Sequence, residues 1–96
     1  MKNLIKGIHR PHVTEKMEYA REHANTYAFE VHDQMNKIEI KRAIEEKFEV
    51  KVKRVRTMHV TGKLKRQGRH AGKRKDWKKA IVTLQEGSTI ELFEGV

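Results

Sequence analysis

The 96-residue chain contains no cysteine, and this absence excludes disulfide bonds and thiolate metal sites. It also has no long apolar run. The first eight residues lack the apolar core of a signal peptide, and no stretch approaches the roughly 20 apolar residues of a membrane span. We therefore expect a cytoplasmic protein without direct membrane insertion. A chain of this length suits a single domain, residues 1–96.

Aromatic residues and enzyme motifs are also scarce. Six aromatics are too few to favour base-by-base reading of single-stranded RNA, so phosphate, sugar and shape contacts suit the composition better. There is no glycine-rich phosphate loop before a helix and no G-x-S-x-G motif. The six histidines show no metal-binding spacing, and we interpret them as surface or packing residues. The sequence predicts a protein that is not an enzyme and has no cofactor or metal.

Positive charge, by contrast, is abundant and concentrated. The net charge is +9, yet residues 1–50 are neutral overall and residues 80–96 carry only three glutamates. Residues 51–79 hold thirteen Lys or Arg and a single acid, Asp76. One dense basic tract is more typical of a binding surface than of a solubility device.

The basic tract could attract nucleic acid, an anionic membrane or an acidic protein. A membrane is disfavoured, because the central loop lacks the aromatic face of an interfacial helix. Residues 62–75 contain three glycines and one large apolar residue, Leu64, and we predict a long basic hairpin loop that a partner would order. The candidate RNA-binding residues are Lys53, Arg54, Arg56, Lys63, Lys65, Arg66, Arg69, His70, Lys73, Arg74, Lys75, Trp77, Lys78 and Lys79. Trp77 could stack on a base, but it begins a strand and we favour a role as core or hairpin anchor.

Hydropathy patterns predict two helices and several strands. Thr14 is expected to cap a first helix, and Asn36 with Glu39 resembles a capping box before a second helix. Strands are expected at 27–31, at 50–61 with a bulge near 53–54, and at 77–84, followed by a turn at 86–88 and a short last strand around 90–93. The order predicts an α+β two-layer sandwich, with a mainly antiparallel sheet and helices on one face.

Several motifs together resemble a known family. They are residues 10–16 (Arg-Pro-His-Val-Thr-Glu-Lys), 36–41, 48–52, the basic tract from Gly62, residues 76–84 (Asp-Trp-Lys-Lys-Ala-Ile-Val-Thr-Leu) and Glu86-Gly87. In this order and over nearly the whole chain, they closely resemble the ribosomal protein L23 family in its bacterial form.

The resemblance implies a structural constituent of the large ribosomal subunit. Members of this family bind 23S rRNA near the polypeptide exit tunnel, contact neighbouring large-subunit proteins, and form part of the docking site for trigger factor and signal recognition particle. Val13 and Glu15 match docking positions in the first helix, and Phe48 and Glu49 match the segment after the second helix. Without the resemblance, the helix dipole alone would account for Glu15.

Two other functions remain open from the residues. A free-standing regulatory RNA-binding domain would need exposed aromatics on its sheet, and a small α+β enzyme would need a convergent polar pocket. The sequence shows neither feature.

Overall fold

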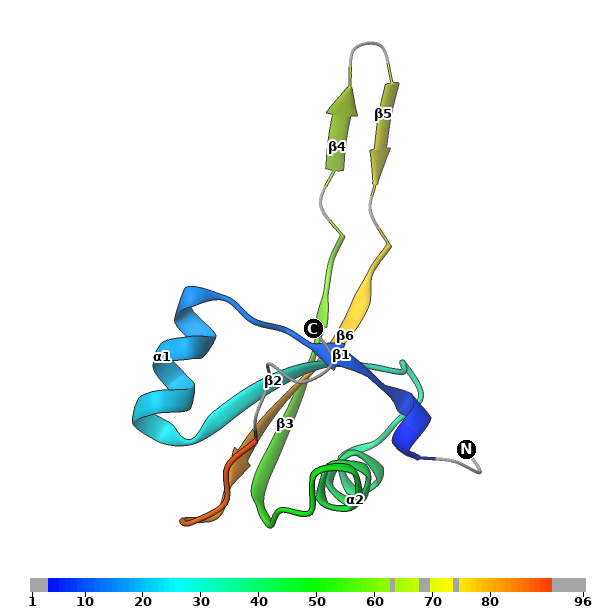
Figure 1. Cartoon of the computed structure of the whole chain (residues 1–96). Helices are drawn as coiled ribbons and strands as arrows, with labels where there is room; N and C mark the ends of the chain where they lie inside the picture. The colour runs from blue at the N-terminus through cyan, green and yellow to red at the C-terminus, as the bar shows by residue number, and fades with distance from the viewer. Residues whose placement is uncertain (1–3, 63, 68–69, 74, 91–96) are drawn as a thin grey trace.

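A computed structural model describes residues 4–62, 64–67, 70–73 and 75–90. Within these residues the chain forms two α-helices, a short 3-10 helix and six strands (Figure 1). Their bounds are η1 (Ile5–Gly7), β1 (Ile8–Pro11), α1 (Glu15–Ala24), β2 (Thr26–Val31), α2 (Lys37–Phe48), β3 (Val52–Val60), β4 (Leu64–Gln67), β5 (His70–Lys73) and β6 (Trp77–Leu84).

Four strands form one antiparallel sheet in the order β1-β2-β6-β3. This arrangement confirms the predicted α+β class with an antiparallel sheet. The expected bulge is also present, because the pairing of β3 with β6 shifts between Val52 and Arg54. The sequence patterns missed β1, a short edge strand that ends at Pro11. Proline is tolerated at such an edge, since its missing N–H leaves no partner unsatisfied.

Both helices begin where their capping residues predict. The Thr14 side chain accepts a hydrogen bond from the Met17 backbone N–H at 3.2 Å. Asn36 and Glu39 form the full capping box, with hydrogen bonds of 2.8 and 3.0 Å. Each helix ends at a residue in the left-handed region, Asn25 after α1 and Glu49 after α2.

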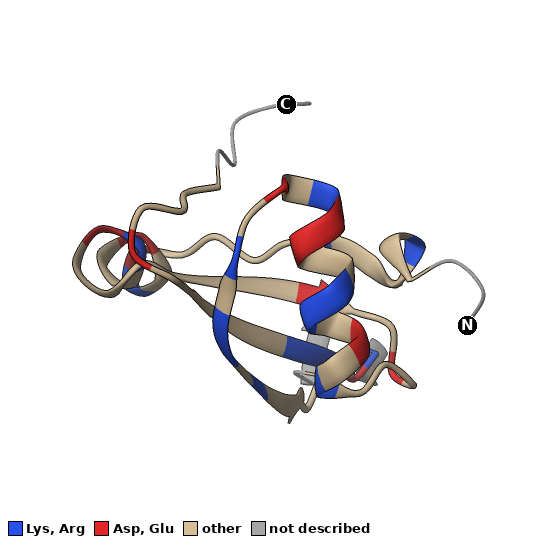
Figure 2. Ribbon diagram, turned by 90° about the horizontal axis from the view of Figure 1, so that it is seen from below, with Lys and Arg blue, Asp and Glu red and all other residues tan. Residues whose placement is uncertain are grey.

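The hydrophobic core lies between α2 and one face of the sheet. Phe29 and Val31 on β2, Val82 on β6, and Ile40 and Ile44 on α2 are all fully buried or nearly so. Figure 2 shows α2 crossing the strands, whereas α1 lies apart from it. The helix α1, described in full, has no buried residue, so the packing of helix on sheet comes mainly from α2.

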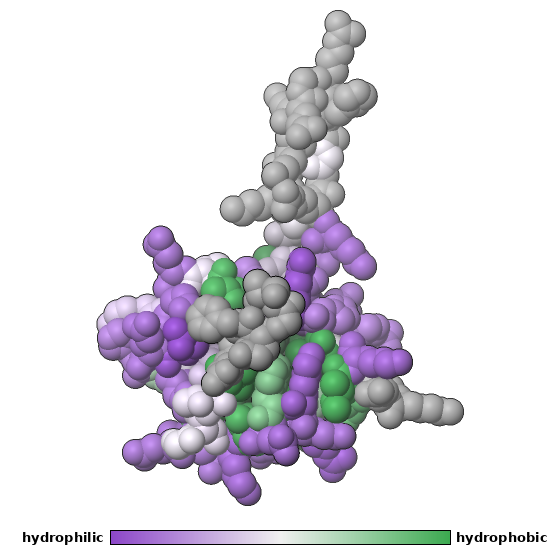
Figure 3. Space-filling view, in the orientation of Figure 1, coloured by the Kyte–Doolittle hydropathy of each residue, from purple (hydrophilic) through white to green (hydrophobic). Residues whose placement is uncertain are grey.

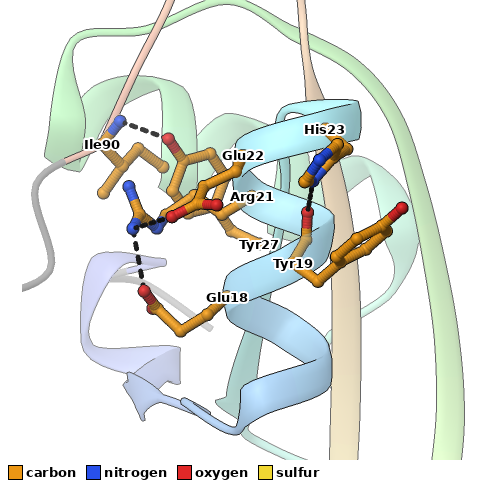
Figure 4. Close-up of polar contacts among 7 residues, drawn as sticks. All are labelled: Glu18, Tyr19, Arg21, Glu22, His23, Tyr27 and Ile90. Atoms are coloured by element: carbon orange, nitrogen blue, oxygen red, sulfur yellow. Dashed lines mark hydrogen bonds and ion pairs between the residues drawn. The ribbon is translucent and has the colours of Figure 1, made fainter.

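Polar contacts position the segment after β6. The Ile90 backbone N–H donates to the Tyr27 hydroxyl at 3.0 Å beside α1 (Figure 4). In the orientation of Figure 1, hydrophobic side chains form a small patch within a mostly hydrophilic surface (Figure 3). The predicted turn is present around Glu86 and Gly87, where the Ser88 N–H bonds to the Gln85 carbonyl. The predicted last strand falls mostly on residues 91–96, outside the described residues.

The predicted loop 62–75 is corrected by the structure. Its described residues include two paired strands, β4 and β5, which extend outward from the ends of β3 and β6 (Figure 1). Backbone hydrogen bonds between strands need no apolar side chains, so a hydropathy pattern does not reveal this pairing. The register places Lys65 opposite Gly72 and Arg66 opposite Ala71.

Candidate nucleic-acid interface

The strand β3 carries the first group of predicted RNA-binding residues. Lys53, Arg54 and Arg56 are all exposed, and β3 is an edge of the sheet. The bulge at Lys53 changes the alternation of the strand, so that Arg54 and Arg56 pair with Thr83 and Ile81. These two arginines therefore share one face of the sheet, opposite the face that α2 covers.

The start of β6 divides its candidates between the two faces. Lys78 pairs with Val31, a core residue, and its ammonium group donates to the backbone carbonyls of Asp33 (3.3 Å) and Met35. This lysine therefore holds the segment before α2. Trp77 and Lys79 alternate with Lys78, are half-buried, and lie on the same face as Arg54 and Arg56.

The extended hairpin carries the remaining candidates. Lys65, Arg66, His70 and Lys73 belong to the paired strands β4 and β5, and Lys75 follows them as an exposed residue. The base of the hairpin is closed by the Gly62 N–H, which donates to the Asp76 carboxylate at 2.7 Å. Lys63, Arg69 and Arg74 lie outside the described residues.

A groove lies at the base of this hairpin, between β1 and the start of β6. In it, the ring of His12 contacts the ring of Trp77, with centroids 4.9 Å apart and an angle of 50° between the planes. Trp77 does not belong to the core cluster. This contradicts the prediction that it anchors the core, whereas its position at the base of the hairpin agrees with the alternative of a hairpin anchor. The sequence predicts His12 only as a surface or packing residue, and its place directly after Pro11 is the one feature of the sequence that sets it apart.

The electrostatics of the groove disfavour the protonated form of His12. Burial lowers the pKa of His12 below its usual value, and the nearby cations Lys79 and Arg10 lower it further, against the opposing charge of Glu30. Glu30 itself accepts a hydrogen bond from Arg10 at 2.7 Å. Its negative charge is therefore largely balanced within the groove.

The four predicted docking residues fall into two separate places. Val13 is 52% exposed, and Glu15 is exposed at the start of α1. Phe48 is half-buried against Phe29, with ring centroids 5.6 Å apart, and Glu49 is exposed at the end of α2. Figures 1 and 2 show the start of α1 well apart from the end of α2, so the four do not form one cluster.

Within the described residues, nothing indicates a metal centre or a membrane span. No three His, Asp or Glu side chains gather as metal ligands there. No helix among these residues is long and apolar enough to cross a membrane. Figure 2 shows Lys and Arg recurring along the strands, as a binding surface for a polyanion requires.

The fold and this surface define a small α+β protein with a basic sheet face and a projecting basic hairpin. Comparison with known proteins agrees with this class. A family profile described as ribosomal protein L23 matches residues 5–92, so the chain belongs to the ribosomal protein L23 family. It is accordingly a structural constituent of the large ribosomal subunit, located on the ribosome in the cytoplasm, and not an enzyme.

Curated relatives are similar over nearly the whole chain. A protein of Syntrophotalea carbinolica is 56% identical over 93 residues, which cover 97% of this chain and 98% of the relative. One of Trichlorobacter lovleyi is 52% identical over 92 residues, 96% of this chain and 98% of the relative. One of Anaeromyxobacter dehalogenans is 56% identical over 88 residues, 92% and 91% of the two chains. Each is named large ribosomal subunit protein uL23.

Proposed function

We propose that the whole chain acts as a single RNA-binding domain that contacts 23S rRNA near the polypeptide exit tunnel, beside neighbouring large-subunit proteins. The observation that carries this proposal is the continuity of positive charge. Arg54 and Arg56 on β3, Lys79 on β6 and the hairpin beyond them come from one tract with a net charge of +12. Lys and Arg side chains supply the charge and donors that phosphate oxygens accept.

Lys78 has a smaller part in this surface than its charge suggests. Its ammonium group already bonds to two backbone carbonyls, so its contribution to RNA binding is indirect. The exposed residues of β3, Lys75 and the hairpin cations are the principal phosphate contacts. His70 and Trp77 belong to the same surface.

The test replaces five hairpin cations by alanine: Lys65, Arg66, Arg69, Lys73 and Arg74. A matched control, the α2 control variant, replaces five exposed cations outside the basic tract, namely Lys16 of α1 and Lys37, Lys41, Arg42 and Lys47 of α2. Both variants lose the same charge. We expect the hairpin variant to bind a 23S rRNA fragment at least tenfold more weakly than the control, measured by filter binding. Equal losses would show that net charge alone drives binding.

We further propose that Val13, Glu15, Phe48 and Glu49 help to dock trigger factor and signal recognition particle. The proposal rests on the resemblance and on the exposure of Val13, Glu15 and Glu49. Because the residues lie at two places, a docked partner would have to span them or use one site. An exposed carboxylate at the start of a helix is accessible to a basic partner segment.

Glu15→Ala tests the docking proposal, with Glu22→Ala as the control on the same helix. We expect Glu15→Ala to weaken trigger-factor binding to mutant ribosomes severalfold, while Glu22→Ala does not. The free energy of unfolding should fall by only about 0.3–1 kcal/mol, through the helix dipole. If trigger-factor affinity stays unchanged and only stability falls, Glu15 is simply a helix-start residue.

A further inference from the structure

The groove at the hairpin base holds an aromatic pair that the charge argument does not explain. Trp77 is the chain's one tryptophan, and it lies on the face of the sheet away from the core rather than among the buried residues. A large apolar ring left partly in solvent gains less from the hydrophobic effect than a buried one. Its position therefore suits recognition of something apolar and planar.

The two rings of this pair are tilted rather than stacked. His12 and Trp77 meet with a 50° tilt, so the imidazole does not cover an indole face as a stacked ring would. Offset or parallel stacking is the arrangement that nucleobases adopt on aromatic side chains.

The groove is lined by cations as well as by carboxylates. Glu30 accepts a hydrogen bond from Arg10, Asp76 accepts one from the Gly62 N–H, and Asp33 also lines the groove. Lys79 lies on the same face as Trp77, and Lys75 lines the groove at the hairpin base. Both lysines line the same groove as Trp77, and ammonium groups donate hydrogen bonds to phosphate oxygens.

We propose that this groove binds one unpaired nucleotide of RNA, its base stacked on Trp77 beside His12 and its phosphates on Lys79 and Lys75. The base must be unpaired, because the face of a base within a duplex is covered by its neighbours. This inference rests on the proposed RNA-binding function and adds a defined subsite. The hairpin would then supply phosphate contacts, and the groove would recognise a splayed base.

The experiment uses the intrinsic fluorescence of the full-length protein, which reports on Trp77 alone. The probes are a short single-stranded oligoadenylate and an abasic strand with the same number of phosphates. We expect the oligoadenylate to quench Trp77 fluorescence at least twofold and to bind several-fold more tightly than the abasic strand. Equal affinities with no quenching would overturn the subsite and leave phosphate binding by the hairpin intact.

Variants then locate the effect. Base stacking on an aromatic ring is worth about 5- to 150-fold in affinity, so Trp77→Leu should lose that much for oligoadenylate and nothing for the abasic strand. His12→Ala should lose less, in the same selective way, while Lys41→Gln on α2 changes neither. Circular dichroism checks that each variant is folded. If Trp77→Leu is unfolded, the affinities of His12→Ala for the oligoadenylate and the abasic strand test the subsite instead. Failure of both strands and of the rRNA fragment to bind would overturn the proposed function as well.

Discussion

At the scale of single residues, Phe48 joins the stability of the fold to a candidate docking place. Its ring packs beside Phe29 and near the Lys47 ammonium group, with 5.6 Å to each from the ring centroid, yet it is only half-buried. A fully buried phenylalanine costs about 3–5 kcal/mol when truncated to alanine. Partial exposure places Phe48 below that range.

We expect Phe48→Ala to lower the free energy of unfolding by about 2–3 kcal/mol, and Phe48→Leu by much less, since leucine keeps most of the apolar volume. Urea unfolding followed by circular dichroism measures both. A loss below about 1 kcal/mol for the alanine variant would mean that the ring contributes little to α2 packing, and would favour a purely docking role.

His12 makes a pH-dependent contribution to stability. Burial and the charges of Lys79 and Arg10 hold the pKa of its imidazole below the usual value, partly opposed by Glu30. The unfolded chain therefore binds a proton more readily than the folded chain. The contribution of His12 to the free energy of unfolding is complete above about pH 6.5 and is lost as the pH falls through the folded-state pKa.

Titration of the His12 imidazole by NMR checks this expectation. The midpoint should lie below about 6.5 in the folded protein. Lys79→Gln should raise it, because one opposing cation is removed, whereas Lys51→Gln in a different part of the molecule should not. A midpoint at or above the usual value would contradict the described environment of the ring.

Residue-scale signals predicted the local structure best where one side chain satisfies a specific backbone group. The caps at Thr14 and Asn36 are examples, since the hydrogen-bond geometry is contained within four residues. The contact between His12 and Trp77 was not predictable in this way. It joins His12, which directly follows β1, to Trp77 at the start of β6, and these two strands are not adjacent in the sheet.

At the scale of elements, apolar periodicity identified α2, β2 and β6 because each buries side chains against the same core. It failed for β1 and for the β4–β5 pair. The strand β1 is four residues long and has one buried residue, Ile8, so it offers too few alternations to detect. The hairpin strands are held by backbone pairing, which hydropathy does not record.

The hairpin is expected to contribute little to global stability. Its strands pair with each other in a two-stranded sheet that is separate from the four-stranded sheet of the core. The five-alanine hairpin variant should therefore melt within a few degrees of the unmodified protein. A melting temperature lowered by many degrees, in differential scanning calorimetry, would show that the hairpin stabilises the body of the fold.

At the scale of the whole molecule, charge is the property that the sequence predicts most directly. The neutral first half of the chain forms both α-helices and the strands β1 and β2. The basic tract forms β3, the hairpin and the start of β6. The fold gathers Arg54 and Arg56 of β3 and Lys79 of β6 on one face, because these strands are neighbours and their register aligns the three residues. Positive charge that is concentrated in one part of the sequence is therefore also concentrated on one part of the surface.

This segregation predicts how RNA binding responds to salt. Each neutralised phosphate releases condensed counterions, so the logarithm of the binding constant falls linearly with the logarithm of salt concentration. If about six phosphates are contacted, the slope should be about −4 to −5 for the free protein and a 23S rRNA fragment. The α2 control variant should keep this slope, and the hairpin variant should show a shallower one. A slope near zero in the unmodified protein would mean that the basic tract is not the contact surface, whatever its charge.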